Sequence, residues 1–148
     1  DLQRELVLFA LAKTRHIIDE VTALDCSAKI QLEGFILKLI PMGDLFHFLM
    51  TDSTLYTNAD AYAFYQKQLN SMIGIVEQAK AQGDIAANIS GSWVVYALDA
   101  LLYAAWQGVN DGYIAVNDAG AFVTGTLFHG IVNPPVGAFA PGFTIPNA

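Results

Sequence analysis

Few side chains in this sequence carry the chemistry of a metal or catalytic site, and they lie far apart. The three histidines, His16, His47 and His129, fall in three separate stretches, and none has a second ligand at metal-binding spacing. A zinc site needs three or four converging ligands. The sequence also lacks a glycine-rich phosphate loop, a Gly-x-Ser-x-Gly nucleophile turn and a close pair of carboxylates in an apolar setting. We therefore expect no metal, no cofactor and no enzymatic activity.

Asp99 is the one acidic residue in an unusual setting. It lies in the apolar stretch 91–110, where Gln107 is another polar side chain. A carboxylate in apolar surroundings needs a partner, and a tyrosine hydroxyl or a ligand amine could provide one. The alternative is that Asp99 bonds to a neighbouring helix.

The elements that must position these groups are all predicted to be helices. Apolar residues recur at spacings of three and four, and no run alternates with a period of two, so we expect an all-α fold. Ser27, Asp44 and Asn58 can cap helices, and Pro41 and Gly83 can end them. The six expected helices span 1–24, 28–40, 44–50, 58–83, 91–110 and 117–132. They form one domain, 1–132, and the uncharged segment 133–148 is expected to be an irregular tail.

Composition indicates that this domain buries more than an ordinary core. Of its 148 residues, 54% are hydrophobic and only 14% are charged, which calls for a second apolar surface such as a partner subunit, a ligand cavity or a membrane. The net charge of -7 argues against binding nucleic acid directly, because cations must neutralise phosphate. The single cysteine, Cys26, cannot form an internal disulfide, which favours a reducing compartment, and we expect a cytoplasmic protein.

One segment carries a resemblance to a known family. The run from Ile75 to Ile85, Ile-Val-Glu-Gln-Ala-Lys-Ala-Gln-Gly-Asp-Ile, resembles a turn of tetracycline-repressor (TetR) family regulators, in which a long helix ends just before a loop and two final helices. The opening Asp-Leu-Gln-Arg-Glu-Leu is similar to the start of that family's linker helix. The resemblance covers residues 1–132 and implies a six-helix C-terminal regulatory domain. The family's N-terminal DNA-binding helix-turn-helix has no counterpart in this chain, so contact with DNA would require that absent head.

The middle helices carry aromatic residues that suggest a cavity. In the implied architecture they would surround a small apolar or aromatic effector. The alternative is that they form plain core, as aromatic residues at helical spacing often do. The candidate ligand-binding residues are Phe35, Leu39, Phe46, Phe48, Tyr62, Tyr65, Leu69, Met72, Asp99 and Tyr103.

The last two helices are apolar on nearly every side, so they need a covering on more than one face. The resemblance implies that they pair with the same helices of a second subunit in a four-helix bundle. The candidate interface residues are Val94, Leu98, Leu101, Ala105, Ala121, Gly125 and Phe128. A membrane hairpin is the alternative. It would place Asp99 near the bilayer centre at a cost of roughly 2.5–3.5 kcal/mol, and no Lys or Arg follows Lys80 to anchor it. We favour the homodimer and expect no membrane.

These observations favour a ligand-responsive transcriptional regulator, a repressor, of which this chain is the effector-binding and dimerising half. Effector binding would shift the dimer between two arrangements and release DNA. A structural oligomerisation domain without a ligand, and a membrane-associated helical protein, remain alternatives. An enzyme built on the same scaffold would require polar groups that converge on Asp99 or His47.

Overall fold

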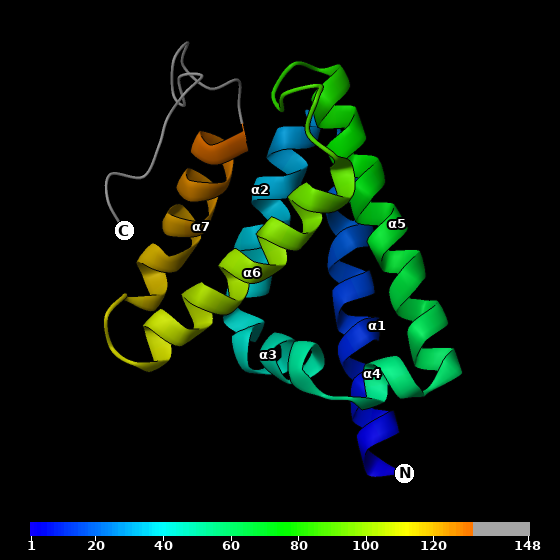
Figure 1. Ribbon diagram of the computed structural model, residues 1–148. Coiled ribbons are helices and arrows are strands. Elements are labelled where there is room, and N and C mark those ends of the chain that lie inside the picture. Colours follow the sequence, from blue (N-terminus) through cyan, green and yellow to red (C-terminus); the bar gives the residue numbers. More distant parts are fainter. Residues whose placement is uncertain (132–148) are drawn as a thin grey trace, which may run out of the picture.

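The computed structural model describes residues 1–131, and all of their regular structure is helical, which confirms the all-α prediction (Figure 1). The segment predicted as a tail, 133–148, and Val132 at the end of the last expected helix lie outside the described residues. The helices are α1 (Leu2–Thr22), α2 (Ala28–Leu39), the 3-10 turn η1 (Ile40–Met42), α3 (Gly43–Thr51), α4 (Thr54–Thr57), α5 (Ala59–Ala81), α6 (Gly91–Asn110) and α7 (Val116–Ile131). The short α4 was expected to be loop.

Local capping explains where several helices begin and end. The side chains of Ser27, Asn58 and Ser90 each accept a hydrogen bond from the backbone N–H three residues further on, at 3.4, 3.0 and 3.5 Å. Gly83 and Gly112 follow α5 and α6 with φ of 85° and 80°, a conformation that favours glycine. The caps at Ser27 and Asn58 and the stop at Gly83 were predicted from the sequence.

The main core lies where α1, α2, α5 and α6 meet. Helices α1, α2 and α5 pack against one another, α6 packs against α5 and α3, and α7 returns along α6 and α2 (Figure 1). Ile18, Ile36, Val76 and Leu98 come from the four different helices and are fully buried. Each such side chain contributes roughly 1.5–3 kcal/mol through its removal from water. This core holds α5 and α6 in fixed positions beside α3.

A second, smaller core ties α3 and α4 to the first half of α1. Leu49 of α3 and Leu55 of α4 are buried against Val7 and Leu11 of α1, together with Ala61 at the start of α5. The two cores therefore divide α1, whose later part belongs to the main core and whose earlier part belongs to this one.

By length and composition, one helical run among the described residues, Ala28–Thr51, could cross a membrane, with a mean hydropathy of 1.3. The run consists of α2, η1 and α3, and its direction changes between α2 and α3 (Figure 1). Phe35 and Ile36 of this run are buried in the main core. A core helix that packs in this way passes the same length and composition test.

Candidate ligand site around Asp99

A hollow lies between α3, α4, α5 and α6, and it is called the outer chamber here. Its volume is about 430 Å³, within the range of small-molecule sites. Helix α6 contributes half of its lining residues, so this helix forms the largest part of its wall. The lining residues are Met50, Thr51, Tyr56, Tyr65, Tyr96, Asp99, Ala100 and Tyr103.

A second hollow, the inner chamber, adjoins the first and extends toward the main core. The two share Met50, Tyr65 and Asp99 as walls. The inner chamber has a volume of only about 40 Å³, enough for a few water molecules but not for an aromatic ring. Its lining residues are Thr14, Ile18, Phe35, Phe46, Leu49, Met50, Tyr65, Gln68, Leu69, Met72, Val95 and Asp99.

Asp99 lies where the two chambers meet, and its carboxylate has no partner among the described residues. Protein surrounds it on most sides, and burial raises its pKa to about 7, from an ordinary value of 3.8. No nearby cation contributes to that pKa. Burial also raises the pKa of Tyr65 to about 12, and the negative charge of Asp99 adds to the effect. The junction of the chambers is therefore a weakly hydrated place that lacks positive charge.

The structure brings most of the predicted ligand-binding residues together in these chambers. Asp99 and Tyr65 line both chambers, and Tyr103 lines the outer one. The remaining four, Phe35, Phe46, Leu69 and Met72, line the inner chamber.

Three predicted ligand-binding residues lie elsewhere. Leu39 lines a separate pocket, described below. Phe48 packs on the small core around Leu49 and Leu55. Tyr62 is 43% exposed on α5. Neither residue is among the lining residues of the two chambers.

Two tyrosines of the outer chamber were missed from the candidate residues. Tyr96 lies on α6 three residues before Asp99, a spacing that places both on one side of the helix and could have revealed it. Tyr56 lies on α4, and its ring packs edge-on against Tyr65 with 6.4 Å between ring centres. No sequence pattern indicates its position, because that position depends on how α4 packs against α1 and α5.

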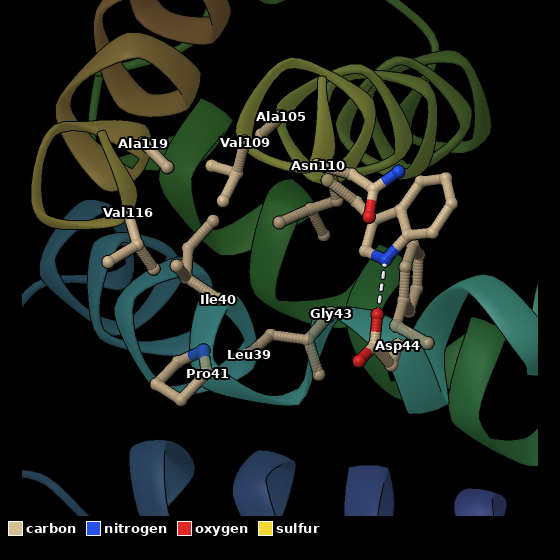
Figure 2. Close-up of a pocket in the computed structure, with 13 residues that line it drawn as sticks. Leu39, Ile40, Pro41, Gly43, Asp44, Ala105, Val109, Asn110, Val116 and Ala119 are labelled. Atoms are coloured by element: carbon tan, nitrogen blue, oxygen red, sulfur yellow. Dashed lines mark hydrogen bonds between the residues drawn. The ribbon is translucent and has the colours of Figure 1, made fainter. Parts of the chain in front are cut away.

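A third pocket, also of about 430 Å³, lies between η1, α3 and the facing ends of α6 and α7 (Figure 2). Asp44 was expected to cap α3, but its Oδ1 atom instead accepts a hydrogen bond of 2.7 Å from Trp106 Nε1. The ring of His47 stacks on Trp106 at 3.8 Å between centres and lies 5.2 Å from Tyr103. These aromatic rings separate the third pocket from the outer chamber. The carboxylate of Asp44 therefore already has a partner in the indole N–H of Trp106.

Most of the predicted interface residues of α6 and α7 do not lie on the exposed sides of these helices. Val94, Leu98, Ala105 and Phe128 are buried in the core of the chain itself, so they cannot form the surface of an interface. The sequence does not distinguish the inner from the outer side of α6, because that helix is apolar all round, and α7, which carries Phe128, is also apolar on more than one side. Leu101 and Gly125 are half-buried, and Ala121 is exposed.

Large apolar side chains instead cover the outer side of these two helices. Trp93 is 64% exposed, Tyr96 53% and Phe122 58%. The small residue Ala104 follows the two α6 aromatics on the same side of the helix and is also exposed. We call these residues, with Ala121, the α6–α7 face.

No family model, curated protein or solved structure matches this chain. The function is therefore argued from the geometry of the chambers and the α6–α7 face.

Proposed function

We propose that this chain is the regulatory half of a ligand-responsive transcriptional repressor, in which a small effector binds the outer chamber and α6 and α7 pair with a second copy. The observation that carries the proposal is that α6 serves both surfaces. Asp99 and Tyr103 face the chamber, and Trp93 and Ala104 lie on the exposed face of the same helix. A ligand that moves α6 would therefore change the pairing surface directly.

The α6–α7 face supports the dimeric part of the proposal. Monomeric proteins rarely expose contiguous apolar patches of several large side chains. Ala104 leaves room for a second helix to approach α6 closely, one to two turns beyond Trp93 and Tyr96. A two-fold pairing would cover the same face on both subunits.

The small core offers a route from the chamber to α1. Met50 and Thr51 of α3 and Tyr56 of α4 line the chamber. The same two helices are held to the first half of α1 by Leu49 and Leu55. An effector that displaces α3 and α4 would move α1, and with it a DNA-binding head attached ahead of α1, as the resemblance to TetR-family regulators implies. DNA would be contacted only through that head.

One observation favours a second candidate, a structural oligomerisation domain without a ligand. The predicted pocket residues Phe35 and Met72 are 3% and 5% exposed, and the inner chamber beside them is small. In that case the aromatic residues would serve as core and the outer chamber would stay empty.

A thermal-shift screen of small aromatic compounds distinguishes the two candidates. Ala100→Trp would fill the outer chamber, and Ala12→Trp, on the exposed side of α1, is the matched control. The regulator predicts compounds that raise the unfolding temperature of the wild-type chain and of Ala12→Trp but not of Ala100→Trp. The structural domain predicts no compound with this pattern.

A further inference from the structure

The lining of the outer chamber combines one carboxylate with several aromatic rings. Asp99 is its acidic group, and Tyr56, Tyr65, Tyr96 and Tyr103 are its rings. None of its lining residues is Lys, Arg or His. The electrostatic character of this hollow is therefore negative, both from the carboxylate and from the electron-rich ring faces.

We infer that the outer chamber binds an organic ammonium ion, with the positive charge beside Asp99 and among the tyrosine rings. The inference rests on the proposal that this chamber is the effector site, and it names the chemical class of the effector. The faces of aromatic rings attract cations, and cages of such rings recognise quaternary ammonium groups. The carboxylate supplies the counter-ion.

Because Asp99 has no partner among the described residues, the chamber should favour a cationic ligand over a neutral or anionic one. A neutral ligand that lacks an N–H or O–H donor would remove water from the carboxylate without providing a partner, and an anionic ligand would be repelled by it. A cation offsets the cost that burial already imposes on Asp99. The third pocket provides a contrast, because its carboxylate, Asp44, is already bonded to Trp106.

Phenyltrimethylammonium and its neutral isostere tert-butylbenzene test the inference, because they share a shape and differ in charge. Titration calorimetry would measure cation binding to the wild-type chain, Asp99→Asn and Asp111→Asn. Asp111 is an exposed carboxylate at the end of the same helix, so its variant is the matched control. We expect Asp99→Asn to weaken cation binding by at least about tenfold and Asp111→Asn to leave it unchanged.

A second variant keeps the test independent of Asp99. Tyr56→Leu removes one ring of the cage at a largely exposed position, and we expect it to weaken binding of the cation several-fold more than binding of tert-butylbenzene. The unfolding temperature would report binding of the neutral compound. Circular dichroism would verify that each variant is folded.

The pH dependence gives a further readout, because a quaternary ammonium ion keeps its charge at every pH. With the pKa of Asp99 at about 7, binding should strengthen from pH 5.5 to 8, by roughly thirtyfold if only the ionised carboxylate binds the cation and by less if the neutral acid also binds it. Tyr65, whose pKa is raised to about 12, stays neutral over this range. His47 packs against Tyr103 at the edge of the chamber, and Asp99→Asn separates the contribution of Asp99 from that of any other group.

Three outcomes decide the matter. Tight cation binding that needs Asp99 supports the inference. Equal binding of both compounds, unaffected by Asp99→Asn, overturns it while leaving the chamber as a site for neutral effectors. If neither compound binds at millimolar concentration, the inference fails and the proposed effector site loses its support as well.

Discussion

The stability of the ligand-free chain should depend on pH through Asp99. Its pKa is about 7 in the folded chain and 3.8 when the chain is unfolded and the group is hydrated. Between these values the folded chain binds more protons than the unfolded chain, so the free energy of unfolding falls as pH rises. The destabilisation is absent below the lower value and complete above pH 7.

The size of this destabilisation follows from the difference between the two pKa values of Asp99. Above pH 7 the loss of unfolding free energy amounts to roughly 4 kcal/mol. With the folded pKa at about 7, about half of this difference, ~2 kcal/mol, should develop between pH 5.5 and 8.

Asp99→Asn removes the titrating carboxyl group, so the variant should lack the pH-dependent loss of stability that Asp99 causes in the wild-type chain. We expect the free energy of unfolding of Asp99→Asn, relative to that of the wild-type chain, to increase by about 2 kcal/mol between pH 5.5 and 8. Urea unfolding followed by circular dichroism at four pH values would measure it, above the isoelectric point of about 4.6. Asp111→Asn should give a constant difference from wild type. A pH-independent difference for Asp99→Asn would refute the reasoning, because it would mean that Asp99 is well hydrated or has an unrecognised partner.

Four further substitutions test the packing and the backbone conformations that position the chambers. Trp106→Phe should lower the free energy of unfolding by about 1 kcal/mol in urea titrations, because it leaves Asp44 without its hydrogen bond. Met72→Ala should cost roughly 2–5 kcal/mol in the same assay and enlarge the inner chamber, since Met72 is 5% exposed. Gly83→Ala should destabilise by about 1 kcal/mol because φ is 85° there. Gly74→Ala, inside α5 with nothing within 4 Å of the added methyl group, should stabilise by roughly 0.5–1 kcal/mol. Equal effects of the two glycine substitutions on the unfolding temperature would contradict the conformational argument.

The helix boundaries were predictable where the signals are local. Ser27, Asn58 and Gly83 act on the backbone within three residues of their own positions, so the sequence alone indicates them. The four-residue α4 was missed because it is too short to show an apolar period. Asp44 was mistaken for a cap because its partner, Trp106, is distant in the sequence.

The candidate site was only partly predictable, for the same reason. Asp99 stands out because it is an acid in an apolar helix, and Tyr65 and Tyr103 follow from the helical spacing. Tyr56 reaches the chamber through the tertiary position of α4, which no local pattern encodes. Trp93 and Phe122, which hydrophobicity would place inside, are exposed, whereas Val94 and Leu98 are buried. On a helix that is apolar all round, neighbouring elements decide which side is outside.

The measurement that tests the account most directly is the solution mass of this chain by light scattering, without detergent, over a range of concentrations. If α6 and α7 pair with a second copy, the mass will be twice 16.0 kDa for the wild-type chain and for Ala12→Arg. The same pairing predicts a single-chain mass for Ala104→Arg, which places a charge in the centre of the α6–α7 face. A wild-type chain that stays at 16.0 kDa at every concentration would contradict the pairing of α6 and α7, and with it the proposed regulatory mechanism.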